Sequence, residues 1–76
     1  MRELVLTFVR GLVDEPSMVS VRERRENGVS HFDLVVAPGD RGRVIGRRGR
    51  TVGALRTLFA AVAERRGEQC RIEVLE

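Results

Sequence analysis

The chain has 76 residues, of which 42% are hydrophobic and 33% charged, and its formal net charge is +3. This length allows one small domain, and the balance of apolar and charged residues is that of a folded protein rather than a disordered one. No apolar run approaches the roughly 18 to 20 residues of a membrane-spanning helix, and the first residues lack the pattern of a signal peptide. We therefore expect a cytoplasmic protein with no membrane contact.

The first part of the chain predicts a helix followed by a hairpin. Residues 2–13 carry apolar side chains at helical spacing, and a helix there should end before Pro16. Residues 18–26 and 29–37 show the alternation of strands, and the Asn27-Gly28 pair between them is typical of a two-residue hairpin turn. In the second strand, the alternating apolar residues Phe32, Leu34 and Val36 are expected to face inward.

The second part predicts two helices and a third strand. Asp40 is a plausible N-cap for a short helix over residues 40–45. A longer helix is expected over residues 50–66, and residues 70–75 alternate as a strand that begins with Cys70. The order α-β-β-α-α-β indicates an α+β fold in which three helices pack on one side of a three-stranded sheet.

Positive charge is concentrated around the loop at residues 46–49, between the two predicted helices. Residues 40–56 hold six arginines and one acid, a local balance of +5, whereas the rest of the chain has a balance of −2. A basic patch on a slightly acidic body is typical of a protein that binds a polyanion. In the loop itself, Gly46 and Gly49 enclose Arg47 and Arg48.

The stretch Val44-Ile45-Gly46-Arg47-Arg48-Gly49-Arg50-Thr51-Val52 resembles the signature of KH domains, which is an aliphatic pair, G-x-x-G and a later aliphatic residue. A helix and a hairpin precede this loop, whereas one helix and one strand follow it, and this is the order of type II KH domains. The chain is similar to the small stand-alone bacterial KH proteins of the KhpA family. The resemblance covers essentially the whole chain and implies a single KH domain over residues 1–76.

The resemblance implies a protein that binds single-stranded RNA, such as an RNA chaperone or a post-transcriptional regulator. KH domains hold about four backbone nucleotides against the G-x-x-G loop, and the free N–H groups at the start of the following helix can bind phosphate. By resemblance, Ile45 and Val52 would help to floor an apolar groove facing the second strand. The residues expected to bind RNA are Arg41, Arg43, Ile45, Gly46, Arg47, Arg48, Gly49, Arg50, Val52 and Arg56. Because the chain has no Trp or Tyr for stacking on bases, we expect low sequence specificity.

Other functions fit the same sequence. The family resemblance implies self-association, pairing with a larger KH protein of the KhpB (Jag) type, and a link to cell shape. The apolar face of the first helix and the alanines of the last helix would suit a protein interface. Type II KH domains also occur in ribosomal and assembly proteins, so a ribosome-assembly factor is a further alternative. The loop could also be a plain turn between helices.

Enzymatic chemistry has little support in this sequence. A P-loop or a dinucleotide-binding loop would need glycine where Val44 stands. His31 and Cys70 are the only residues of their types, and no acid pair or metal-ligand cluster accompanies them. We therefore predict a protein that is not an enzyme and has no catalytic residues, metal, cofactor or small-molecule substrate.

Overall fold

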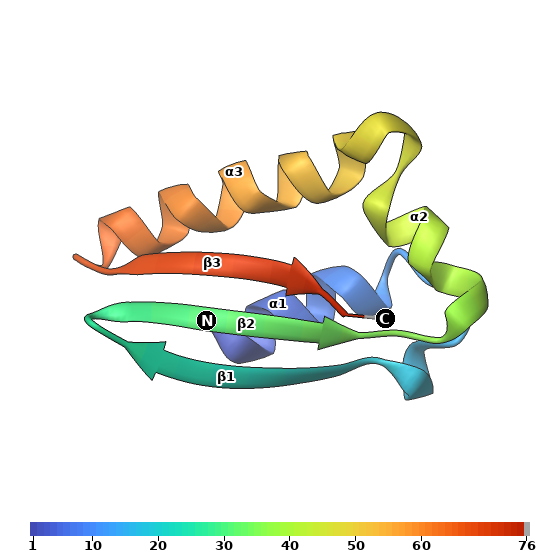
Figure 1. Cartoon of the computed structure of the whole chain (residues 1–76), viewed down its shortest axis with the longest axis horizontal. Helices are drawn as coiled ribbons and strands as arrows, with labels where there is room; N and C mark the ends of the chain where they lie inside the picture. The colour runs from blue at the N-terminus through green and yellow to red at the C-terminus, as the bar shows by residue number, and fades with distance from the viewer. Residues whose placement is uncertain (76) are drawn as a thin grey trace.

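The computed structural model describes residues 1–75, and its elements follow one another in the predicted order (Figure 1). The helices and strands are α1 (Arg2–Arg10), β1 (Ser20–Glu26), β2 (Val29–Val35), α2 (Arg41–Ile45), α3 (Arg50–Arg65) and β3 (Gln69–Val74). Short 3₁₀ turns precede β1, α2 and α3, and they are Pro16–Met18, Pro38–Asp40 and Arg47–Gly49. No helix in residues 1–75 is long and apolar enough to cross a membrane.

The sheet has the strand order β1-β2-β3. β1 and β2 form an antiparallel hairpin, and its turn places Asn27 at φ 51° and Gly28 at φ 77°, as the sequence predicted. β3 pairs with β2 in parallel. Because parallel neighbours need a long crossover connection, α2, the glycine loop and α3 lie between them in the sequence. β3 is therefore an edge strand, and α3 runs alongside it (Figure 1).

The core lies between one face of the sheet and the helices. Phe32 and Leu34 of β2 are fully buried, and their cross-strand partners Ile72 and Val21 are nearly so. From the helices, the core takes Val5, Leu6, Val9, Val44, Leu55 and Phe59. Each fully buried side chain of this size stabilises the fold by about 1.5–3 kcal/mol. All three helices contribute to this core, which confirms the predicted α+β arrangement.

The structure corrects the predicted end of the first helix. α1 ends at Arg10 rather than at residue 13, and Gly11 occupies the C-cap position. Glycine is unfavourable inside a helix because of its backbone entropy. Leu12 and Val13 still pack against the core from the segment that follows, which explains why their spacing resembled a helix.

Prolines shift three other predicted boundaries. β1 begins at Ser20 instead of residue 18, because Pro16 starts a 3₁₀ turn that includes Met18. β2 ends at Val35 instead of residue 37. The 3₁₀ turn that begins at Pro38 includes Asp40, so α2 begins at Arg41 instead of residue 40. The ends of α3 and β3 lie within one residue of their predicted positions.

Asp40 precedes α2 as predicted, but its side chain does not cap that helix. Asp40 is 3% exposed, and its two carboxylate oxygens accept hydrogen bonds from the backbone N–H groups of Asp14 and Glu15, each at 3.1 Å. Asp40 therefore ties the segment after α1 to the start of α2. This role depends on residues 25 and 26 positions away in the sequence, which local sequence patterns do not reveal.

Candidate nucleic-acid interface

The glycine loop has a backbone that its two glycines make possible. Gly46 adopts φ 78° and ψ 167°, and a Cβ atom placed there would lie 2.3 Å from Oγ1 and 2.7 Å from the backbone nitrogen of Thr51. Only glycine occupies this conformation without strain, and only glycine permits so close an approach. The loop thus folds tightly against the first turn of α3.

The other end of the loop also uses left-handed backbone. Arg48 has φ 58° and Gly49 has φ 72°, and the chain closes through a 3.1 Å hydrogen bond from the Gly49 N–H to the Gly46 carbonyl. This turn leaves Arg47 and Arg48 exposed to solvent. Two guanidinium groups therefore project from a short, well-defined turn.

The loop leads directly into the N-terminus of α3. Gly49 is the N-cap, and no side chain caps the first turn. The first N–H groups of a helix and its dipole together make a partial positive charge, which adds to the charge of Arg47, Arg48 and Arg50. The geometry brings these groups to one end of the molecule, where α2 and α3 meet (Figure 1).

The remaining predicted arginines differ in their surroundings. Arg43 is exposed and forms an ion pair with Asp14 at 3.0 Å, so part of its charge is compensated. Arg41 is half-buried at the start of α2. Arg56 is exposed on α3, and its Nε donates a hydrogen bond of 3.0 Å to the backbone carbonyl of Ile72 on β3. The six arginines that were predicted to bind RNA therefore differ in exposure and in the contacts that they make.

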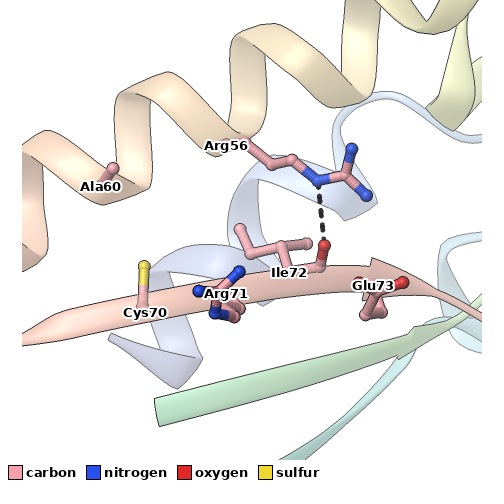
Figure 2. Close-up of a pocket in the computed structure, with 6 residues that line it drawn as sticks. All are labelled: Arg56, Ala60, Cys70, Arg71, Ile72 and Glu73. Atoms are coloured by element: carbon pink, nitrogen blue, oxygen red, sulfur yellow. Dashed lines mark hydrogen bonds between the residues drawn. The ribbon is translucent and has the colours of Figure 1, made fainter. Parts of the chain in front are cut away.

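A hollow of about 430 Å³ lies beside α3, and β3 forms its opposite wall (Figure 2). Its lining residues are Arg56, Ala60, Cys70, Arg71, Ile72 and Glu73. The RNA groove was expected to face the second strand, whereas this hollow lies beside β3, and Phe32 and Leu34 of β2 are fully buried in the core. Val52 is also buried, at 6% exposure, whereas Ile45 is half-buried.

The hollow continues toward the far end of α3. A second hollow shares Ala60, Cys70 and Arg71 with the first and extends to Glu64 and Glu68. We call the two together the α3–β3 groove. Its end near the glycine loop contains Arg56 and Glu73. Its other end contains Glu64, Glu68 and Arg71, and Glu68 forms an ion pair with Arg25 at 3.8 Å. Charges of both signs therefore line the groove.

Cys70 lies within this groove. Its thiol donates a hydrogen bond of 3.4 Å to the backbone carbonyl of Phe59, and burial raises the pKa of the thiol, with a further contribution from the negative charge of Glu68. A raised pKa keeps the thiol protonated and unreactive at neutral pH. Among residues 1–75, no group of three or more metal-ligating side chains lies together.

Sequence reasoning did not place Cys70, Arg71, Ile72 and Glu73 in the candidate site. The alternation of apolar and polar residues predicted a strand here, but it did not predict which strand and which helix lie beside it. The parallel pairing of β3 with β2 puts β3 at the edge of the sheet beside α3, and no local signal in the sequence encodes that partner. The only available signal was the resemblance to a family with known topology.

The element order, the mixed three-stranded sheet and the G-x-x-G turn between two helices define a KH module of type II. The family model described as the KH domain of KhpA and KhpB matches residues 2–74, and the chain belongs to this family.

Curated relatives agree with this assignment. The chain is 38% identical to the RNA-binding protein KhpA of Chlamydia trachomatis over 76 residues, which cover all of this chain and 97% of the relative. It is 38% identical to the RNA-binding protein KhpA of Listeria monocytogenes and 37% identical to that of Halalkalibacterium halodurans, and both alignments cover each chain completely. The names of these relatives describe binding and no reaction, in agreement with the prediction that the chain is not an enzyme.

Proposed function

We propose that this protein binds single-stranded RNA and holds the RNA backbone at the Gly46–Gly49 loop. The observation that carries the proposal is the exposed pair Arg47 and Arg48 on a glycine-bounded turn, next to the uncapped N-terminus of α3. Relatives of full length that are named as RNA-binding proteins support the choice of ligand.

Recognition in this proposal is mainly electrostatic. The loop attracts phosphates, and the neighbouring α3–β3 groove receives bases. The three phenylalanines offer no stacking surface in the groove, because Phe32 and Phe59 are fully buried and the exposed Phe8 lies on α1, outside the residues that line the groove. Binding should therefore tolerate many sequences, as in an RNA chaperone or a post-transcriptional regulator.

The test is the double substitution Arg47→Asp with Arg48→Asp, measured by fluorescence anisotropy with labelled single-stranded RNA. The matched control is Arg65→Asp with Arg66→Asp, which makes the same charge change at the other end of α3, about 22 Å away at 1.5 Å per residue. Both control residues are exposed. We expect the loop variant to lose binding while its circular dichroism spectrum is retained, and the control to keep most of its affinity.

Salt dependence gives an independent measure. Each phosphate contact on a single strand contributes about −0.7 to the slope of log K against log salt. Replacing one of the two loop arginines by Gln should reduce the magnitude of that slope by a similar amount. Equal losses in the loop and control variants, or affinity independent of salt, would refute the proposed contact with phosphates.

A second candidate function is protein association, either with another copy or with a KhpB-type KH protein. It rests on exposed apolar side chains of the helical layer, since Leu4 and Phe8 of α1 and Leu58 of α3 are 37%, 44% and 39% exposed. Phe8 contacts Phe59, so α1 and α3 pack against each other at this point.

Sedimentation velocity tests this second candidate. Leu58→Asp should shift a dimer toward monomer, whereas Met18→Asp, at an exposed apolar residue on a different segment, should not. A protein that sediments as monomer at high concentration would refute self-association. Sequencing of RNA crosslinked to the protein in cells would distinguish a general RNA regulator from a ribosome-assembly factor.

A further inference from the structure

Arg56 lines the end of the α3–β3 groove near the glycine loop, and it makes a contact with β3 that binding to phosphate does not explain. It lies about 9 Å along α3 from Arg50, at 1.5 Å per residue, and its Nε donates to the carbonyl of Ile72 at 3.0 Å. Figure 2 shows the two terminal nitrogens projecting beyond Nε. They make no hydrogen bond or ion pair within residues 1–75.

The hydrogen bond of Arg56 changes what β3 offers to a ligand. In a parallel pair, successive residues of the edge strand direct their backbone groups alternately toward the partner strand and away from it. Ile72 directs its carbonyl away from β2, toward α3, where the Arg56 guanidinium occupies it (Figure 2). The edge therefore presents guanidinium N–H donors at a place where an exposed strand would present a carbonyl acceptor.

The bond also fixes the guanidinium plane. Arginine has a planar fork of donors that can form two parallel hydrogen bonds with one partner. With Nε held by Ile72, the two terminal nitrogens remain as a fork oriented by the protein before any ligand binds. A pre-oriented fork recognises a pair of acceptors, and it disfavours a partner that presents a donor.

We propose that Arg56 is a specificity-determining residue that reads the edge of one base in the groove and prefers guanine. This inference rests on the proposed function, because it requires an RNA strand held at the Gly46–Gly49 loop. Guanine offers the acceptor pair O6 and N7, which is the most common bidentate partner of arginine, whereas adenine presents its N6 amino donor at the same place. The protein then binds RNA of most sequences but prefers guanine at one position of the bound strand.

Other groups of the groove are consistent with this assignment. The small side chain of Ala60 leaves space in the hollow beside Arg56, and Ile72, whose side chain is buried in the core, contributes only its backbone there. Glu64 and Glu68 line the far end of the groove together with Arg71, and Glu73 lines the same end as Arg56. A base directed into the groove from a backbone held at the loop reaches Arg56 before it reaches Glu64 and Glu68.

The experiment measures anisotropy with labelled heptanucleotides of uridine that carry one guanosine, one adenosine or one 7-deazaguanosine at each position in turn. The wild-type protein should favour guanosine over adenosine roughly tenfold at one position, as expected for a bidentate pair. Substitution by 7-deazaguanosine, which lacks the N7 acceptor, should remove most of that preference. Arg56→Lys keeps the charge but loses the fork, and it should bring the ratio close to one. Arg65→Lys is the matched control and should leave the ratio unchanged.

The outcomes separate this inference from the proposed function. If Arg56→Lys weakens binding of all the oligonucleotides equally, Arg56 contacts phosphate or only supports β3, and the inference is overturned while RNA binding at the loop stands. A wild-type protein that shows no preference for guanosine at any position overturns it as well. If binding does not depend on Arg47 and Arg48, both the proposed function and this inference are overturned. Because the readout is a ratio between oligonucleotides, a small loss of folded protein in a variant does not change it.

Discussion

Gly46→Ala is the substitution for which the structure makes the sharpest prediction. A Cβ atom at this position would lie 2.3 Å from Oγ1, 2.7 Å from Cβ and 2.7 Å from the backbone nitrogen of Thr51. A side-chain rotation can relieve the first contact, but not the other two, because those atoms belong to the first turn of α3. The loop and the helix must therefore move apart.

Two costs contribute to the destabilisation. The backbone at φ 78° and ψ 167° lies in a region open mainly to glycine, and forcing another residue there costs about 1–3 kcal/mol. Overpacking against Thr51 adds about 1–3 kcal/mol. A domain of this length has a free energy of unfolding of about 4–11 kcal/mol, so Gly46→Ala should remove a large part of it.

Gly49→Ala provides the matched comparison, since it lies in the same loop. Its φ of 72° also disfavours alanine, but no atom lies within 4 Å of the added Cβ. The expected cost is only the left-handed backbone penalty of about 1–2 kcal/mol. Urea unfolding followed by circular dichroism measures both variants, and the midpoint of Gly46→Ala should be clearly lower. If the two variants have equal stability, the close packing of Gly46 against Thr51 is not the reason that this position requires glycine.

Two further predictions follow from Asp40 and Cys70. Asp40→Ala should lower the free energy of unfolding by about 1–3 kcal/mol, because two part-buried backbone N–H groups lose their acceptor. The control Asp14→Ala breaks only an exposed ion pair and should cost less than about 1 kcal/mol. Equal losses of the two variants in urea unfolding would contradict the role of the Asp40 carboxylate as an acceptor. Burial raises the pKa of Cys70, so alkylation by iodoacetamide should be slow at pH 7 and accelerate at alkaline pH. The same shift favours the folded state while the thiol is protonated, and this contribution is lost as pH rises above about 8.5, where an unfolded cysteine ionises. Saturating single-stranded RNA should slow the alkylation further because Cys70 lines the groove, and an unchanged rate would place the RNA elsewhere.

Local patterns in the sequence were sufficient to predict the elements and their order. Hydrophobic periodicity identified the helices and strands, and Asn27-Gly28 specified the hairpin turn, because these signals act within a few residues. The predicted boundaries were wrong where a glycine or a proline altered the chain, at Gly11, Pro16 and Pro38. There, packing against the core kept nearby apolar residues buried without the regular structure that their spacing indicated.

The candidate site was predicted in part. The Gly46–Gly49 loop and its arginines were evident because glycines, charge and flanking aliphatic residues are adjacent in the chain. The groove was predicted beside the second strand, whereas the hollow in the structure lies between α3 and β3, since the neighbour of α3 depends on how β2 and β3 pair. The carboxylate of Asp40 was expected to cap its own helix, whereas it binds backbone groups far away in the sequence.

The sequence by itself determined the class of this protein, because the order of elements and the G-x-x-G turn are local features that a type II KH fold requires. The tertiary structure decided which residues share the groove, and it distinguished six arginines that the sequence treats alike. Arg43 lies beside an acid, Arg47 and Arg48 project from the loop, and Arg56 binds the edge of β3. The contacts of Arg43 and Arg56 join residues far apart in the sequence, and the contact of Arg56 forms only because parallel pairing brings the last strand beside α3.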